Sequence, residues 1–125
     1  MRALRLPVCY QVNDQRRALP TAAARSAVGL ADDALVLTCF SQTYKLTEPF
    51  MGAWLEALRE HERAVLWLYV PHARARHHLR AYAERAGIDA NRVVFAAAAP
   101  QAEHLSRLRC ADLALDVLPY GSHTT

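Results

Sequence analysis

The fold is decided by residues 34–70, which read ALVLTCFSQTYKLTEPFMGAWLEALREHERAVLWLYV. The two ends of this stretch, 34–40 and 64–70, are short apolar runs rich in strand-forming residues, a pattern typical of strands buried on both faces. Between them, Thr47 can cap a helix. The apolar residues that follow at helical spacing are Phe50, Trp54, Leu55 and Leu58. The stretch therefore predicts a strand, a helix and a second strand.

The same alternation continues toward the C-terminus. The pattern predicts a helix over 73–86 that ends at Gly87, a strand over 92–96, a helix that begins at Pro100 and a strand over 113–117. Strands and helices that alternate at this pace indicate βαβ units and a parallel sheet with helices on both faces. The fold class is therefore α/β and Rossmann-like.

The two ends of the chain differ from this middle part. Residues 1–33 lack long periodicity, so we expect a connecting segment with a short helix over 22–28 that Gly29 ends. Residues 34–125 form the expected Rossmann-like domain. After the fourth strand the sequence gives a loop but no further helix, so one face of the sheet lacks cover. We therefore expect the chain to be truncated within this domain.

Composition excludes several classes of protein. The 125 residues suffice for one domain, and 53% hydrophobic with 22% charged residues excludes disordered, collagen-like and coiled-coil chains. No apolar run approaches the roughly 20 residues that span a bilayer, and the N-terminus has no signal-peptide pattern. We therefore expect a cytoplasmic protein that binds no membrane. The net charge of +3 comes from arginines interspersed with acids, which gives no support to a nucleic-acid partner.

Several reactive side chains have plain structural interpretations. The three cysteines lie far apart without a CxxC pair, and Cys39 and Cys110 fall in apolar stretches, where a cysteine usually packs as a small hydrophobe. His77 and His78 are adjacent on a helix and point to different sides, so they make a poor metal pair. Asp116 is either a buried acid or, because Pro119 follows closely, a turn-capping residue.

The candidates for a ligand site are the loops after Phe40, Val70, Ala96 and Val117, because ligands of open parallel sheets bind at the carboxyl ends of the strands. Two of these loops, the first and the last, carry residues that suit a ligand. The sequence lacks GxGxxG, GxxxxGK[ST], HExxH and GxSxG motifs. The first loop contains Gln42 and Lys45, donors that suit a phosphate, although a solvated turn is the plainer interpretation. In the second loop Gly121 allows close approach to a ligand, and residues 122–125 offer hydroxyls, an imidazole and helix-start amides to an anion. A simple helix cap is equally compatible with that second loop.

The motifs occur together in an order that is recognisable as a family pattern. They are Leu6-Pro7-(x)2-Tyr10-Gln11-x-Asn13-Asp14, Cys39-Phe40-Ser41-Gln42-Thr43-Tyr44-Lys45, Val65-Leu66-Trp67-Leu68, Ala99-Pro100-(x)2-Glu103-His104, Ala111-Asp112-Leu113-Ala114-Leu115-Asp116 and His123-Thr124-Thr125. Nearly the whole chain resembles the catalytic C-terminal domain of the O-GlcNAc transferase and SPINDLY-like glycosyltransferases, in a bacterial version.

The resemblance implies a two-domain GT-B glycosyltransferase, usually preceded by tetratricopeptide repeats. It implies a nucleotide-sugar donor, UDP-GlcNAc, whose sugar passes with inversion to a Ser or Thr hydroxyl of an acceptor protein. It also implies that no divalent metal takes part, so that the protein itself neutralises the diphosphate leaving group.

The resemblance assigns two groups of residues to the phosphate side of the donor. Gln42 and Lys45 match positions that contact the diphosphate, and Lys45, the only lysine in the chain, would stabilise the departing UDP. His123, Thr124 and Thr125 match a phosphate-binding turn at a helix start.

It assigns a third group to the nucleobase. Ala98 and Ala99 match the backbone that reads the base, and His104 matches a histidine beside it. Two residues depart from the family pattern: Ser41 stands where asparagine is common, and Gln101 replaces a lysine that contacts the nucleotide in animal members. The second departure leaves the identity of the nucleotide open.

Other functions stay open at this stage. The motifs identify neither a general base nor an acceptor site in the chain, so we expect the 125 residues alone to be inactive. The alternatives are a non-catalytic nucleotide-binding or interaction module, and a GT-B enzyme that uses GDP-fucose or UDP-glucose.

Overall fold

The computed structural model describes residues 16, 18, 20–118 and 121. Four parallel strands form one sheet in the order β3-β2-β1-β4. The strands are β1 (Leu35–Cys39), β2 (Ala64–Tyr69), β3 (Val93–Ala96) and β4 (Leu113–Ala114). The helices are α1 (Glu48–Glu60), α2 (Ala73–Arg85) and α3 (Gln101–Leu108), with the short 3-10 helices η1 (Arg25–Val28), η2 (Thr43–Lys45) and η3 (Ala90–Arg92). The predicted α/β class with a parallel sheet is confirmed.

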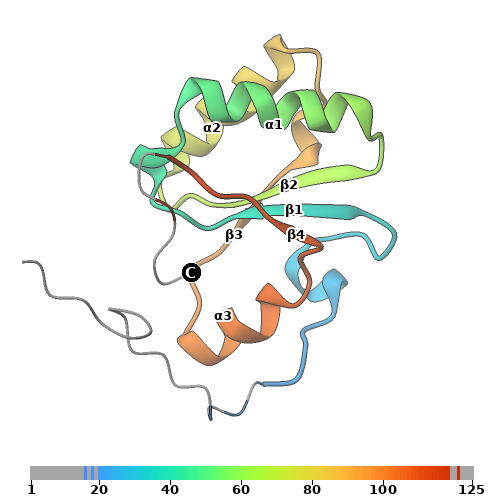
Figure 1. The fold of residues 1–125 in the computed structure, drawn as a ribbon, viewed down its shortest axis with the longest axis vertical. Helices are drawn as coiled ribbons and strands as arrows, with labels where there is room; N and C mark the ends of the chain where they lie inside the picture. The colour runs from blue at the N-terminus through green and yellow to red at the C-terminus, as the bar shows by residue number, and fades with distance from the viewer. Residues whose placement is uncertain (1–15, 17, 19, 119–120, 122–125) are drawn as a thin grey trace, which may run out of the picture.

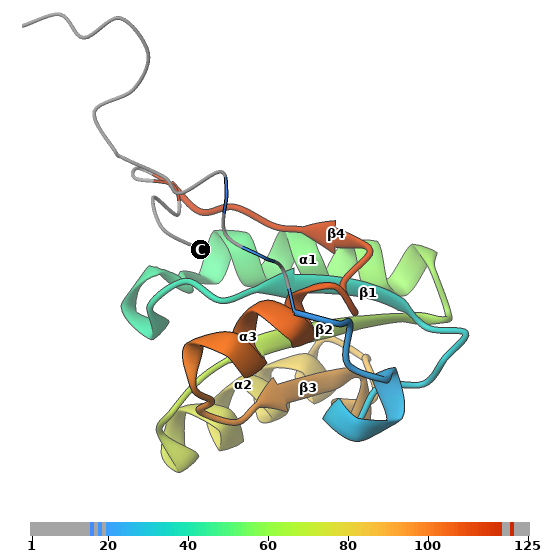
Figure 2. The same cartoon turned by 90° about the horizontal axis from the view of Figure 1, so that it is seen from below.

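Helices lie on both faces of the sheet. Helices α1 and α2 cover one face, and α3 and η1 lie on the other (Figure 1; Figure 2 shows α3 on its face of the sheet from below). The chain steps from β1 to β2 to β3 in one direction, so right-handed crossovers place α1 and α2 on the same face. After β3 the chain crosses back to β4, which lies on the other side of β1, so α3 lies on the opposite face of the sheet from α1 and α2. None of the helices in the described residues is long and apolar enough to cross a membrane.

Each face of the sheet carries its own apolar core. Trp54, at 7% exposure, packs in the core between the sheet and the helices α1 and α2. Trp67 is fully buried and packs in the core on the opposite face of the sheet, which includes Leu30 after η1. Both tryptophans are therefore core residues, one on each face of the sheet. Cys39 and Cys110 are buried free thiols, one in each core, as expected for small hydrophobes.

Helix ends follow the predicted signals except at Thr47. Gly29 and Gly87 adopt the left-handed conformation, with φ of 77° and 78°, just after η1 and α2, as C-cap glycines do. Thr47 has the extended backbone of an N-cap, but its side chain makes no capping hydrogen bond. One reason is that Pro49, at the second helical position, has no N–H to donate.

The fourth strand is shorter than predicted. Only Leu113–Ala114 pairs with β1, whereas the sequence predicted a strand over 113–117. The ladder ends with the bond from the Leu115 N–H to the Thr38 carbonyl, at 2.7 Å. Beyond it, the Asp116 carboxylate accepts the N–H of its neighbour Val117 at 2.8 Å. A local side-chain bond of this kind replaces a ladder bond and so favours a turn over a strand.

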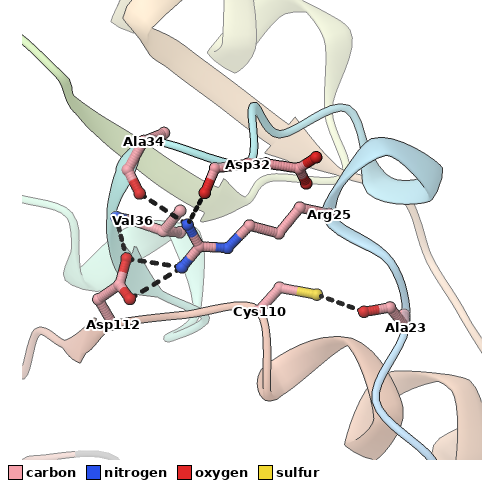
Figure 3. A network of polar contacts seen from close by, with 7 residues as sticks. All are labelled: Ala23, Arg25, Asp32, Ala34, Val36, Cys110 and Asp112. Atoms are coloured by element: carbon pink, nitrogen blue, oxygen red, sulfur yellow. Dashed lines mark hydrogen bonds and ion pairs between the residues drawn. The ribbon is translucent and has the colours of Figure 1, made fainter.

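An ion-paired clamp closes the amino end of the sheet (Figure 3). The Arg25 guanidinium donates to both Asp112 carboxylate oxygens at 2.8 Å and to the carbonyls of Asp32 and Ala34 at 3.0 and 2.8 Å. Asp112 in turn accepts the Val36 N–H at 2.8 Å. That backbone bond and the Arg25 charge lower the pKa of Asp112. The clamp thus joins η1 to the starts of β1 and β4.

Candidate functional site

The strand order places a ligand site at one end of the sheet. Strands β1, β2 and β3 follow one another in one direction, and β4 lies on the other side of β1. The order therefore reverses between β1 and β4. In open α/β sheets, the crevice outside the carboxyl ends of the strands at such a reversal is where ligands bind. The loop after β1 and the loop after β4 are the parts of the chain that meet there.

A cavity of about 240 Å³ opens at this end of the sheet. It is lined by the loop after β1, the end of β2, the loop after β3 and helix α3. The lining residues are Phe40, Gln42, Tyr69, Ala98, Ala99, His104 and Arg107. The structure thus brings together four of the residues singled out from the sequence, although they come from segments some 60 positions apart. We call this space the carboxyl-end cavity.

His104 presents an uncharged ring to the carboxyl-end cavity. Its ring lies 5.4 Å from the Phe40 ring, centroid to centroid, and its Nδ1 lies 3.2 Å from an Arg107 nitrogen. Burial lowers the pKa of His104, and the nearby Arg107 charge lowers it further. Because Arg107 has only donors, His104 accepts at Nδ1, so its Nε2 is left to carry the proton. A neutral ring of this kind suits stacking on a flat ligand.

Arg107 is a site residue that sequence reasoning missed. It is 93% buried (7% exposed), lies over the Phe40 ring at 5.3 Å, and donates to the Ala97 carbonyl. Burial lowers its pKa, yet a guanidinium stays charged at neutral pH. The signal was present in the sequence, because Arg107 follows His104 by three residues and such pairs share a helix face.

Lys45 belongs to the same end of the sheet but not to the lining of the carboxyl-end cavity. The 3-10 helix η2 leaves its side chain half-buried, and the Lys45 Nζ donates to the Gly121 carbonyl at 3.4 Å. This long hydrogen bond joins the loop after β1 to the loop after β4. The ammonium is thus held at the strand-order reversal, one turn along from Gln42.

Gly121 allows a close approach, but to a protein group. A Cβ at this position would lie 2.5 Å from an Asp116 carboxylate oxygen, so a larger residue would force one of them to move. Asp116 is exposed and caps its own turn, which supports the turn-capping interpretation over that of a buried acid. Among the described residues after β4, Gly121 therefore lies close to Asp116, and its carbonyl is turned to Lys45.

The remaining predicted residues divide into two groups. His123, Thr124 and Thr125 lie outside the described residues. His77 and His78 are exposed on α2 with ring centroids 6.1 Å apart. Within the part of the chain that the structure describes, no three His, Cys, Asp or Glu side chains gather as a metal site would require.

Comparison with known proteins identifies relatives along almost the whole chain. Residues 11–125 match the model of the glycosyl transferase family 41. The chain is 31% identical over 126 residues to the probable UDP-N-acetylglucosamine--peptide N-acetylglucosaminyltransferase SEC of Arabidopsis thaliana, covering 96% of this chain. It is 33% identical over 102 residues to a UDP-N-acetylglucosamine--peptide N-acetylglucosaminyltransferase of Caenorhabditis elegans, covering 82% of this chain. The chain spans only 13% and 9% of the length of these two relatives.

The fold leads to the same relatives. The structure is similar to that of the K341M mutant of the Thermobaculum terrenum O-GlcNAc transferase, with a TM-score of 0.70 and 25% identity. The similarity covers 83% of this chain and 19% of that one. The resemblance inferred from the motifs is thereby confirmed. Since the family model matches all but the first ten residues, the chain belongs to glycosyl transferase family 41.

Proposed function

We propose that this chain forms the donor-binding part of a glycosyltransferase that moves N-acetylglucosamine from UDP-GlcNAc to Ser or Thr hydroxyls of proteins. The observation that carries the proposal is the carboxyl-end cavity. It joins Gln42, Ala98, Ala99 and His104, the residues that the family resemblance assigns to the donor, with a buried cation from Arg107. Two of the relatives carry names for transfer of this kind.

The cavity offers a base-binding arrangement. The neutral His104 ring can stack on a flat base, and the exposed backbone around Ala98 can pair with the polar edge of that base. Arg107 adds a donor beside the ring. An aromatic and amide-lined space of this kind suits a pyrimidine nucleotide.

The diphosphate would lie toward the reversal in strand order. Lys45 and Gln42 stand on the same short turn, and the carbonyl of Gly121 holds the ammonium in place. A fixed positive charge at the point where the leaving group gains charge stabilises the transition state, with no reorganisation at the moment of reaction. Lys45 would supply that charge when the bond between the sugar and UDP breaks.

Isothermal titration of UDP and of GDP into the chain tests the proposal. We expect UDP to bind, GDP to bind less tightly, and Lys45→Ala to weaken UDP binding at least about tenfold, since a charge-assisted contact contributes about 1.5–3 kcal/mol. Arg63→Ala, which removes an exposed cation just before β2 at the amino end of the sheet, is the matched control and should leave the affinity unchanged. Unaltered UDP binding in Lys45→Ala would remove Lys45 from the donor site.

The same titration separates the alternatives. Preference for GDP would favour a GDP-fucose donor, and binding of neither nucleotide would favour an interaction module without a donor. Transfer itself should be measured in a longer protein of this family that contains these residues, because we expect the acceptor site outside this chain.

A further inference from the structure

Helix α2 carries the net positive charge of the chain. It holds four arginines and one acid, Glu84, which gives the helix a net charge of +3 at neutral pH. The whole chain, with 15 basic and 12 acidic residues, has the same net charge of +3. The other 11 basic and 11 acidic residues therefore cancel, and the excess belongs to this one helix. Its arginines are Arg74, Arg76, Arg80 and Arg85.

The arginines of α2 have no carboxylate partner within the part of the chain that the structure describes. The ion pairs found there are Arg25 with Asp112 and Arg59 with Glu56, and neither involves α2. Three of the four arginines of α2 are exposed. Cations gathered on one helix without carboxylate partners create a positive potential that attracts an acidic partner.

Two of these arginines are already held in place by aromatic rings. Arg80 lies over the Phe95 ring at 5.1 Å, and Arg85 lies over the Tyr82 ring at 5.8 Å. A guanidinium over a ring leaves its in-plane N–H groups available to a carboxylate. Because the cation is already positioned, less side-chain entropy is lost when a partner binds to it.

A groove of about 380 Å³ lies between α1 and α2. The two helices lie side by side on one face of the sheet (Figures 1 and 2). We call this space the α1–α2 groove. It is open to solvent, and its exposed edges carry His78 and Arg85 from α2 and Glu48 from α1. Between these edges the lining is apolar or aromatic, from Leu46, Met51, Leu79 and Tyr82.

The cations and the α1–α2 groove lie on the same side of α2. Arg74, His78 and Arg85 are separated by four and seven positions, so they share one face of the helix. His78 and Arg85 line the groove, whose opposite edge carries the acid Glu48. An occupant is therefore favoured when its acidic residues face α2 and stay away from Glu48.

We propose that the α1–α2 groove binds an acidic amphipathic helix of another protein. The apolar side of that helix fills the groove against Leu79 and Tyr82, and its carboxylates pair with the arginines of α2. Helices dock in grooves of this kind through apolar residues one turn apart. Burial of the apolar side provides affinity, and the charges select the partner and speed its association. A nucleic acid would pair with the arginines but leave the apolar groove empty.

Fluorescence anisotropy with synthetic peptides tests the proposal. The probe is a fluorescein-labelled peptide of LEELAEA repeats, about 20 residues long so that it can form a helix. We expect it to bind the 125-residue chain in a saturable way at physiological ionic strength. The basic peptide of LKKLAKA repeats should not bind. The peptide of AEEAAEA repeats keeps the acids but lacks the leucines, and its Kd should be at least about tenfold higher. Equal binding of the AEEAAEA peptide would mean charge attraction without docking, and would overturn the proposal.

Charge substitutions locate the bound peptide. Arg85→Glu should raise the Kd of the LEELAEA peptide at least about tenfold, because it replaces an attraction by a repulsion. Arg109→Glu makes the same change at an exposed position just after α3, on the opposite face of the sheet, and should leave the Kd unchanged. Glu48→Gln should lower the Kd, a gain that damage to the fold cannot produce. Equal effects of Arg85→Glu and Arg109→Glu would overturn the assignment to this groove.

Three further measurements decide the kind of occupant. A single-stranded oligonucleotide of equal charge should bind more weakly than the LEELAEA peptide, and tighter binding would assign the surface to nucleic acid. Sedimentation should show a monomeric chain, whereas a dimer that the peptide dissociates would make a second copy the occupant. A longer protein of this family that contains these residues should bind the peptide as well. Loss of binding there would mean that another part of the same protein covers the groove, and would overturn docking of a separate protein.

Discussion

Among single residues, His104 shows most clearly how burial sets the state of a side chain at the site. Its imidazole touches Phe40 on one side and Arg107 on the other, and both burial and the Arg107 charge lower its pKa. A histidine with a lowered pKa in the folded state binds its proton less readily than in the unfolded chain. The lowered pKa of His104 therefore does not reduce the free energy of unfolding at neutral pH. As the pH falls below the unfolded pKa of about 6.5, this free energy decreases.

The Arg107→Gln variant separates the two causes of this shift. Removing the guanidinium charge should raise the pKa of His104 toward the usual value, while the burial contribution stays. Titration of the His104 Cε1–H by nuclear magnetic resonance, in both chains, measures the change. An unaltered or lower midpoint in Arg107→Gln would mean that the charge of Arg107 does not reach the ring.

Some residues of the site could be predicted and others could not. Gln42, Ala98, Ala99 and His104 were chosen from motif order, and the structure places all four around one cavity. Whether they bind a donor remains a prediction. Its spacing from His104 places Arg107 on the same face of α3, but its burial and its contacts with Phe40 and the Ala97 carbonyl arise from packing between distant segments, so it was missed. Thr47 shows the opposite error, since a favourable capping residue found no N–H at Pro49.

At the scale of elements, helix α1 shows why the first βαβ unit was predictable. Of the four residues predicted for its apolar face, Trp54, Leu55 and Leu58 are buried against the sheet, and Phe50 packs partly buried against the same core. Local periodicity and tertiary burial agree here, so the sequence pattern suffices. In β4 they disagree: the apolar run continues to Val117, but only Leu113–Ala114 has a neighbouring strand to pair with among the described residues.

Leu58 in α1 provides a test of the core between the sheet and the helices α1 and α2. It is fully buried, so Leu58→Ala should lower the free energy of unfolding by about 2–5 kcal/mol, through lost apolar burial and a cavity. Leu113→Ala in β4, where the side chain is 54% exposed, is the matched control and should cost less than about 1 kcal/mol. Urea unfolding followed by circular dichroism measures both. Equal losses would mean that α1 does not pack as the structure shows.

The Arg25–Asp112 clamp ties three elements together and has a distinct pH signature. Asp112 has a lowered pKa, so its contribution to stability is present above the unfolded pKa of about 3.9 and is lost as the pH falls through the folded value. Asp112→Asn should lower the free energy of unfolding by about 1 kcal/mol at pH 7, a modest value because the carboxylate is 39% exposed and solvent screens it.

Urea unfolding at pH 7 and at pH 3 checks the clamp. The difference between the unaltered chain and Asp112→Asn should shrink at the lower pH, because the stability that the charged carboxylate contributes is progressively lost below its unfolded pKa. Asp33→Asn is the control, because Asp33 is exposed in the segment before β1 that also contains Arg25. Its effect on the free energy of unfolding should not shrink between pH 7 and pH 3. A difference of constant size at both pH values would assign the effect of Asp112→Asn to packing rather than to charge.

For the whole molecule, strand order explains both what was predictable and what was not. The alternation of apolar runs and amphipathic segments predicts a parallel sheet, because such strands must be buried on both faces. It does not predict that β4 lies beside β1 rather than beyond β3. That placement creates the reversal at which Lys45 meets Gly121, and it follows from packing between segments far apart in the chain.

The clamp and the carboxyl-end cavity lie at opposite ends of one sheet, and this has a consequence for how such proteins diversify. Arg25 and Asp112 fasten the amino ends of β1 and β4, while Gln42, His104 and their neighbours surround the carboxyl ends. Substitutions around the carboxyl-end cavity can therefore accumulate without weakening the Arg25–Asp112 clamp. In proteins built on this sheet, the preferred ligand can therefore change through substitutions at the carboxyl ends of the strands, while the fastened amino ends stay as they are.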